Sequence, residues 1–290
     1  MTAAVFPGQG AQYVGMGKDL YQNYPAAKSL FDKANEILHF DLTQIMFEGT
    51  DEELKQTKVT QVAVFLHSIA SFTVLNQHTI SMVAGHSLGE YTALVACKAL
   101  SFEDALVLVS KRAAAMQKAC VQNPSTMLAV VGLEEEKIQQ ICNSVKGEVV
   151  TVANYNSPSQ IIVSGTMKGI EEVATQVKEL KARAIPLNVG GAFHSPLMQS
   201  AEEELKQAII PLEFDAPICP IYQNIDGKAH TNPQEIKQNL IAQLTKPVQW
   251  TQTIQNMIAD GASEFAEFGP GNVLKGLIKK INSEVICIEQ

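Results

Sequence analysis

A serine flanked by glycines is the feature that most constrains the fold of this chain. Residues 80–95 read ISMVAGHSLGEYTALV, an apolar run followed by Gly85-His86-Ser87-Leu88-Gly89 and then by helix-forming residues. A G-x-S-x-G sequence between a strand and a helix is typical of a sharp turn that exposes the serine hydroxyl. The segment predicts Ser87 as a nucleophile, with the backbone N–H of Leu88 facing a developing oxyanion. An ordinary strand-to-helix turn with the serine as a helix cap is the alternative.

Short apolar runs alternate with segments of helical period over much of the chain. The runs are Ala3–Phe6, Ile80–Ala84, Ile218–Tyr222, Glu264–Phe268 and Val285–Ile288. Strands that alternate with helices predict a parallel sheet in an α/β fold. We therefore expect a hydrolase-like large α/β subdomain that is formed by residues 1–122 and 191–290.

Residues 123–190 follow a different order of elements. The pattern predicts a strand, an amphipathic helix, two strands joined by NYNSP, a second amphipathic helix and a last strand; the predicted strands are Met127–Leu133, Val149–Ala153, Gln160–Ser164 and Ala184–Val189. This β-α-β-β-α-β order is that of the ferredoxin-like split unit. We expect a ferredoxin-like small subdomain at 123–190, inserted into the larger one, with a ligand cleft between the two.

Composition and charge exclude several classes of partner. The net charge is −8, and the 22 basic residues form no cluster, which argues against nucleic acid as the main partner. The six histidines lack metal-ligand spacing, so no metal site is expected. No apolar run approaches the ~20 residues that a membrane helix needs. Five scattered cysteines fit reduced thiols in a cytoplasmic protein.

A serine hydroxyl needs a base, and His194 is the candidate. It lies in GGAFHSPL, in a loop between the last strand of the small subdomain and a following helix, where catalytic residues tend to collect. His86 is the rival, although the turn that exposes Ser87 should point its neighbours elsewhere. The remaining histidines lie in polar or helical settings typical of structural residues.

Arg112 falls on the apolar stripe of the helix predicted around Glu103–Ala119. A buried guanidinium without a partner is costly, so an anion should meet it. That anion is either a carboxylate of the protein or a substrate carboxylate held bidentately. A side chain that extends to solvent would need neither.

Several short motifs follow one another along essentially the whole chain. They are FPGQG at 6–10, TQ at 60–61, GHSLGE at 85–90, Arg112 with MQ at 116–117, NYNSP at 154–158, GAFHSPLM at 191–198, PVQW at 247–250 and FGPGNVLKGL at 268–277. In this order they resemble the malonyl-coenzyme A:acyl carrier protein transacylases, the malonyl-loading acyltransferases of fatty acid and polyketide synthesis. Val62, Ala113 and Ser159 depart from the family pattern, and none of them is a predicted catalytic residue.

The resemblance implies a catalytic role for five residues. Ser87 is the nucleophile and His194 is the general base. The main-chain carbonyl of Gln249 orients the histidine ring in place of the usual aspartate. The backbone N–H groups of Gln9 and Leu88 form the oxyanion hole.

The resemblance also implies how the substrate is bound. Arg112 binds the malonyl carboxylate, and Phe193 accompanies malonyl rather than branched acyl groups. Gln61, Asn154 and Asn156 are expected to line the pocket.

The resemblance further implies the reaction and its partners. A malonyl group would pass from malonyl-CoA to Ser87 and then to the pantetheine thiol of holo acyl carrier protein, with no cofactor. Fatty acid synthesis is the expected use, and loading of a polyketide synthase in trans is the alternative. Such carriers are usually acidic, so docking needs a basic patch, for which Lys181, Arg183 and Lys275 are candidates; a solvated face is the alternative reading of these three.

Two other classes of function remain to be weighed. An α/β-hydrolase esterase shares G-x-S-x-G, but such enzymes run Ser…Asp/Glu…His along the chain. Only His194 and His230 follow Ser87 here. A non-catalytic scaffold that binds the carrier protein is the second alternative, although Ser87, His194 and Arg112 are all intact.

Overall fold

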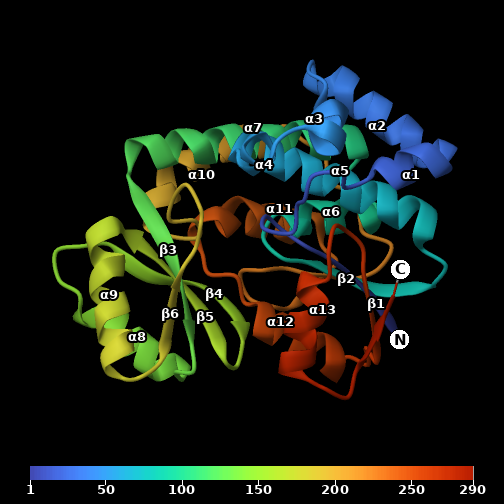
Figure 1. Cartoon of the computed structure of the whole chain (residues 1–290). Coiled ribbons are helices and arrows are strands. Elements are labelled where there is room, and N and C mark those ends of the chain that lie inside the picture. Colours follow the sequence, from blue (N-terminus) through green and yellow to red (C-terminus); the bar gives the residue numbers. More distant parts are fainter. Residues whose placement is uncertain (290) are drawn as a thin grey trace.

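Two separate β-sheets organise the computed structural model, which describes residues 1–289 (Figure 1). The larger sheet has the strand order β10-β9-β1-β2-β7-β8. Its strands are β1 (Thr2–Phe6), β2 (Ile80–Gly85), β7 (Ile221–Tyr222), β8 (Ala229–His230), β9 (Glu264–Glu267) and β10 (Ile286–Ile288). All neighbours pair in parallel except β7 and β8. The predicted α/β fold with a parallel sheet is therefore confirmed.

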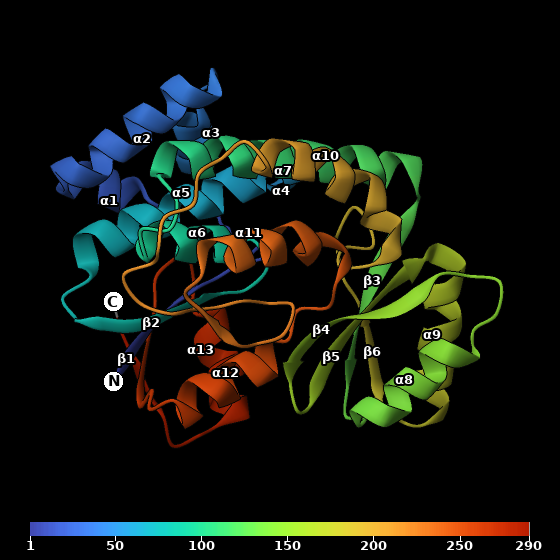
Figure 2. The same ribbon diagram turned by 180° about the vertical axis from the view of Figure 1, so that it is seen from behind.

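Helices cover both faces of this sheet (Figure 2). One layer contains α1 (Lys18–Asn23), α2 (Pro25–Leu38), α3 (Leu42–Glu48), α4 (Asp51–Lys55), α5 (Thr57–Leu75), α6 (Gly89–Ala96), α7 (Phe102–Gln122), α10 (Gln199–Ile209) and α11 (Pro233–Ala242). The other contains α12 (Trp250–Ala259) and α13 (Val273–Ile281). Alternate residues of β1 serve the two layers: Ala4 and Phe6 join the first core, Ala3 and Val5 the second. Burial on both faces explains why the strand is apolar from Ala3 to Phe6.

One helix departs from the expectation that no apolar segment is long enough to cross a membrane. By length and composition α5 could do so, with a mean hydropathy of 1.4 over its most apolar window. In the structure 72% of that window is buried. The helix packs beneath α2 and α7, and even polar residues such as Thr60 and Gln61 are buried within it. It is therefore a core helix.

The smaller sheet forms the ferredoxin-like subdomain. Its order is β4-β5-β3-β6, and every pair is antiparallel. The strands are β3 (Ser125–Val131), β4 (Val150–Ser157), β5 (Gln160–Thr166) and β6 (Arg183–Pro186), and the helices α8 (Glu135–Ser144) and α9 (Met167–Glu179) cover one face. Residues of the other face, such as Met127 and Ile162, turn toward the large subdomain. The limits 123 and 190 stay a prediction.

The predicted connection NYNSP is mostly strand. β4 continues through Ser157, which leaves only Pro158 and Ser159 between β4 and β5. The extension pairs with β5 as far as Ser157, which faces Gln160. The chain before α12 also pairs with the outer edge of β4. Val248 donates its N–H to the carbonyl of Ala153 at 2.8 Å and accepts the N–H of Tyr155 at 2.9 Å. This pairing ties the two subdomains together beside the cleft.

Candidate active site

A cavity of about 250 Å³ lies between the two subdomains. Its lining includes every predicted site residue except Gln249: Gln9, Gln61, Ser87, Leu88, Arg112, Asn154, Asn156, Phe193 and His194. The apolar part of the wall comes from Met116 and from residues of the small sheet such as Met127, Ala129 and Ile162. The predicted cleft and the predicted site therefore coincide.

Ser87 occupies a sharp turn between β2 and α6. Its φ of 53° lies in the left-handed region, where an ordinary side chain is strained. The flanking glycines make the turn possible. A Cβ on Gly85 would lie 1.9 Å from the carbonyl carbon of Gly89, and a Cβ on Gly89 would lie 2.0 Å from the carbonyl oxygen of Phe6. The strand, turn and helix are thus packed backbone to backbone, which leaves Ser87 exposed to the cavity.

Ser87 and His194 form a hydrogen-bonded pair across the cleft. Ser87 Oγ lies 2.7 Å from His194 Nε2. On the other side of the ring, Nδ1 lies 3.0 Å from the carbonyl oxygen of Gln243 and 3.2 Å from that of Lys246. Carbonyl oxygens only accept, so Nδ1 carries the proton and Nε2 is free to accept one from the serine hydroxyl.

The prediction that the carbonyl of Gln249 orients the ring is wrong. Gln249 is the N-cap of α12, and its carbonyl accepts the N–H and the hydroxyl of Thr253 at 2.8 and 2.9 Å. A helix N-cap carbonyl is directed into its own helix and is not available to a distant ring. Gln243 and Lys246, in and just after the 3₁₀ turn η2 (Gln243–Thr245), supply the carbonyls instead.

His194 is held in its neutral form. Burial and the nearby Arg112 guanidinium lower the pKa of His194 to about 3. The imidazole is therefore uncharged near neutral pH, which is the state that can accept a proton. The rival His86 is directed elsewhere, because its Nε2 lies 2.8 Å from Oδ1 of Asn156 and its ring packs against Trp250.

Two residues of the predicted oxyanion hole, Gln9 and Leu88, line the cavity from different loops. Among the described residues, neither the N–H of Gln9 nor that of Leu88 has a hydrogen-bond partner. The FPGQG loop packs tightly on the serine turn, since a Cβ on Gly8 would lie 2.6 Å from the carbonyl oxygen of His86. This close approach brings Gln9 beside the turn, as an oxyanion hole of two donors requires.

Arg112 reaches the cavity from α7 and is only 1% exposed. Its Nη1 donates to Gln61 Oε1 at 2.7 Å, and its Nη2 donates to Ser87 Oγ at 3.0 Å and to Gln243 Oε1 at 3.4 Å. Within residues 1–289 no carboxylate lies within ion-pair distance of it. The structure therefore does not support a protein carboxylate as its partner, nor a side chain that extends to solvent.

Three further predicted pocket residues are buried in the wall of the cavity. Gln61 contacts Met116 Sδ through its amide nitrogen at 3.2 Å, and so is held between Arg112 and Met116. Asn154 is buried on β4. Phe193 is also buried, and its carbonyl accepts the hydroxyl of Ser164 at 2.6 Å, which anchors the loop before His194.

Sequence reasoning missed two residues that hold the serine turn. Asn224 Oδ1 accepts the N–H of Ser87 at 2.6 Å, and its Nδ2 donates to the carbonyl of Gly85, also at 2.6 Å. Gln243 Nε2 donates to the carbonyl of Ser87 at 2.9 Å. Neither residue belongs to a recognisable motif, and the one local signal is that Gln243 interrupts an otherwise apolar run after Leu240.

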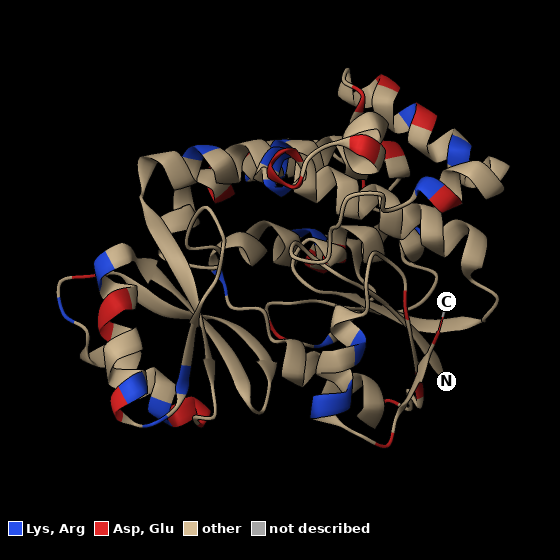
Figure 3. Ribbon diagram, in the orientation of Figure 1, with Lys and Arg blue, Asp and Glu red and all other residues tan. Residues whose placement is uncertain are grey.

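The candidate docking residues lie outside the cavity. Arg183 begins β6 and pairs with Val131, whereas the cavity is lined by Leu187, about 13 Å further along the chain at ~3.3 Å per residue. Lys275 is on α13, with its ammonium 2.7 Å from Glu289. Acidic and basic residues are interspersed over both subdomains (Figure 3).

Comparisons with known proteins agree with this geometry. The model of the acyl transferase domain family matches residues 4–285. The malonyl CoA-acyl carrier protein transacylase of Bacillus subtilis is 44% identical over 99% of this chain and 92% of its own length. The crystal structure of an acyl carrier protein S-malonyltransferase from Vibrio cholerae superposes with a TM-score of 0.94 at 40% identity, covering 99% of this chain and 95% of that one.

A second similar structure contains a carrier protein. It is a type II PKS acyl-carrier protein in complex with its malonyl-transacylase, with a TM-score of 0.95, 36% identity and coverage of 99% of this chain and 94% of that one. Each match spans nearly the whole length of this chain and of the protein it is compared with. The chain therefore belongs to the acyl transferase family, among the malonyl CoA-acyl carrier protein transacylases.

Proposed function

We propose that this protein transfers a malonyl group from malonyl-CoA to the pantetheine thiol of holo acyl carrier protein through an ester on Ser87. One observation carries the proposal. Ser87 Oγ lies between His194 Nε2 at 2.7 Å and the Arg112 guanidinium at 3.0 Å. A base on one side and a buried, unpaired cation on the other match the two ends of a malonyl thioester, which reacts at its carbonyl and carries a carboxylate two carbons away.

In the first half-reaction His194 Nε2 removes the proton of the Ser87 hydroxyl as Oγ attacks the thioester carbonyl. The N–H groups of Gln9 and Leu88 donate to the oxyanion that forms, while Arg112 holds the free carboxylate. The C–S bond then breaks, and the proton on His194 passes to the sulfur of coenzyme A. The products are the malonyl-serine ester and free coenzyme A.

The second half-reaction runs the same steps in reverse order. His194 removes the proton from the carrier's pantetheine thiol, and the sulfur attacks the ester carbonyl. The C–O bond breaks, and Ser87 regains its proton from His194. A thioester is consumed and a thioester is formed, so the exchange needs no external energy source.

An esterase is less well supported by this site. His194 is oriented by backbone carbonyls and has no carboxylate beside it within residues 1–289. The cavity also places a guanidinium where an esterase of neutral substrates would have apolar side chains. A scaffold without activity would have no need of an aligned Ser87–His194 pair.

We also infer that the protein acts in the cytoplasm, where carrier proteins and reduced thiols occur together. All five cysteines are free. Supply of malonyl groups to fatty acid synthesis is our proposal, with loading of a polyketide carrier as the alternative that one structural relative illustrates.

The test is to follow the fate of isolated malonyl-enzyme. The protein is incubated briefly with malonyl-CoA, freed of small molecules and divided into buffer and holo carrier protein. We expect rapid discharge only with the carrier, and malonyl-carrier as the product. Decay to free malonate at the same rate in both samples would support the esterase and contradict the proposal.

A further inference from the structure

A buried carboxyl group lies directly behind the serine turn. Glu90, on the first turn of α6, is fully buried, and in the described chain no Lys or Arg lies within ion-pair distance of it. Its Oε2 accepts the backbone N–H of Asn224 at 2.7 Å, and its Oε1 accepts the side-chain amide of Gln223 at 3.1 Å. Burial of a carboxylate with no cation in direct contact is costly, so the chain retains it at a cost in stability.

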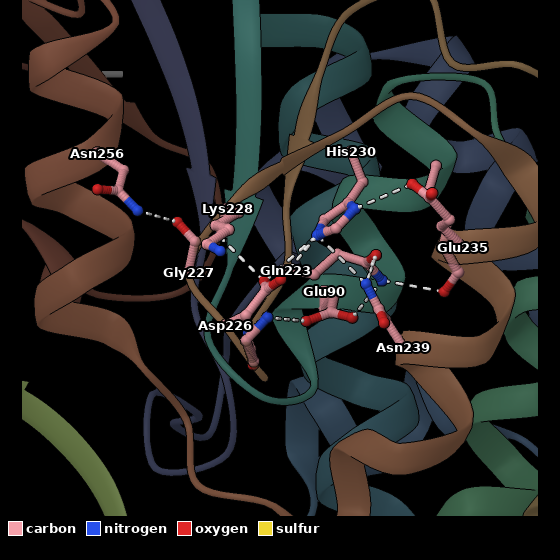
Figure 4. Close-up of polar contacts among 11 residues, drawn as sticks. Glu90, Gln223, Asp226, Gly227, Lys228, His230, Glu235, Asn239 and Asn256 are labelled. Carbon is pink, nitrogen blue, oxygen red and sulfur yellow. Dashed lines mark hydrogen bonds and ion pairs between the residues drawn. The ribbon is translucent and has the colours of Figure 1, made fainter.

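Glu90 is the inner end of a longer chain of polar contacts (Figure 4). Gln223 accepts a hydrogen bond from Asn239 at 2.9 Å, and Asn239 lies 3.3 Å from Nε2 of His230. His230 in turn faces Asp226 at 3.1 Å and Glu235 at 3.6 Å. Hydrogen bonds therefore connect the buried carboxyl group to residues at the surface, on the side away from Ser87.

These contacts fix the position of the backbone at Ser87. The backbone of Asn224 is fixed by Glu90, and its side chain bridges the carbonyl of Gly85 and the N–H of Ser87, both at 2.6 Å. One amide thus clamps the turn between Gly85 and Ser87, and Ser87 has a left-handed φ of 53°. A strained backbone persists only when its surroundings hold it in place.

We infer that Glu90 is a positioning residue for the nucleophile, and that it acts by fixing Asn224 against the serine turn. The inference rests on the proposed role of Ser87. Glu90 contacts neither the cavity nor Ser87 Oγ, so its effect is on the alignment of Ser87 and of the adjacent Leu88 N–H. A misplacement of about 1 Å can cost on the order of 10²-fold in rate.

The protonation state of Glu90 gives this role a distinctive signature. Burial raises the pKa of Glu90 to about 7, against the opposing effect of the bonds from Asn224 and Gln223. The titratable or charged groups that face it are Arg112 from α7 and Tyr91 on its own helix; the segment of Gln223 and Asn224 and the turn at Gln243 contribute only amides. Protonation turns one of the two carboxylate oxygens into a hydroxyl, which is a weaker acceptor, and so weakens the clamp. The acylation rate should fall as pH drops below about 7.

The experiment compares Glu90→Gln, Asn224→Ser and the double variant with the wild type. Single-turnover acylation by malonyl-CoA is followed between about pH 5.5 and 8.5, and each rate is normalised to the number of acylatable sites. Glu235→Gln is the matched control, because it removes a carboxylate from the exposed end of the same chain of contacts.

For Glu90→Gln we expect an acylation rate about 10- to 100-fold below that of the wild type and a KM for malonyl-CoA within about threefold of the wild-type value. Its pH–rate profile should lack the pH limb, that is, the fall in rate below about pH 7 that we expect for the wild type. Asn224→Ser should show a similar loss, and the double variant no more than the worse single one, because both act through one contact. Glu235→Gln should behave as the wild type. A Glu90→Gln rate within about twofold of wild type, or additive losses in the double variant, would overturn the inference.

A further variant keeps the inference testable if Glu90→Gln fails to fold. Glu90→Asp keeps the carboxylate on a shorter side chain, so it should be slower than the wild type yet retain the pH limb. Loss of that limb in a folded Glu90→Asp protein would contradict the inference. Failure of the wild type itself to be acylated would instead refute the proposed function.

Discussion

Replacement of Arg112 by alanine should change which acyl group the enzyme prefers. The guanidinium is buried, has no carboxylate partner among residues 1–289 and lies 3.0 Å from Ser87 Oγ. A malonyl carboxylate bound there makes two charge-assisted hydrogen bonds, each contributing about 1.5–3 kcal/mol. Loss of both costs about 3–6 kcal/mol, or about 10²–10⁴-fold in kcat/KM for malonyl-CoA.

The ratio of malonyl to acetyl transfer isolates this effect. Arg112→Ala also removes a contact with Ser87, which slows both substrates by a common factor that cancels in the ratio. Acetyl-CoA has no carboxylate to lose, so the malonyl-to-acetyl ratio of kcat/KM should fall by about 10²–10⁴.

The assay measures transfer of each acyl group to holo carrier protein at several substrate concentrations. Lys111→Ala is the matched control, since Lys111 is the exposed neighbour on the same helix. If Arg112→Ala lowers both rates equally and leaves the ratio unchanged, the guanidinium does not select the malonyl carboxylate, and the reasoning is refuted.

Three further predictions test other parts of the account. Gly89→Ala should lower the free energy of unfolding by about 3 kcal/mol or more, because the added Cβ would clash with backbone atoms. Gly276→Ala is at a helical position with open space around it and should raise the free energy of unfolding by up to about 1 kcal/mol. Equal denaturation midpoints of the two variants would contradict this prediction. The pKa of His194 is lowered from 6.5 to about 3, so its contribution to stability is complete above pH 6.5 and is lost as pH falls toward 3. Between these pH values the free energy of unfolding of His194→Gln should therefore fall less steeply than that of the wild type. Parallel curves of unfolding free energy against pH would contradict this. Combined Lys181→Ala and Arg183→Ala substitutions should raise the KM for carrier protein most at low salt, so the KM of the variant should depend less on salt than that of the wild type; a salt dependence equal to the wild type's would remove these residues from the docking surface.

Local sequence patterns predicted the elements that build the reactive centre. The strand, turn and helix around Ser87 require two glycines at fixed positions, and the five-residue motif G-x-S-x-G contains both of them. The order of elements in the small subdomain was likewise readable from hydrophobic periodicity. Such features depend on neighbours in the chain, which is why they can be read without the structure.

Contacts between distant segments could not be read in this way. Asn224 and Gln243 are separated from Ser87 by more than a hundred residues, and only the tertiary fold brings their amides to the serine turn. The PVQW motif points to Gln249, but the position of this residue at the start of α12 directs its carbonyl into the helix. The motif NYNSP predicts a connection, whereas its first four residues continue β4 beside β5, and Val248 binds the outer edge of this extension.

The most direct test of the central claim is the site of acylation. The intact masses of wild type and Ser87→Ala are measured after brief exposure to malonyl-CoA, and the labelled peptide is identified. The account predicts a single malonyl adduct on the peptide that contains Ser87, and none on the variant. An adduct on any other residue, or equal labelling of Ser87→Ala, would contradict it.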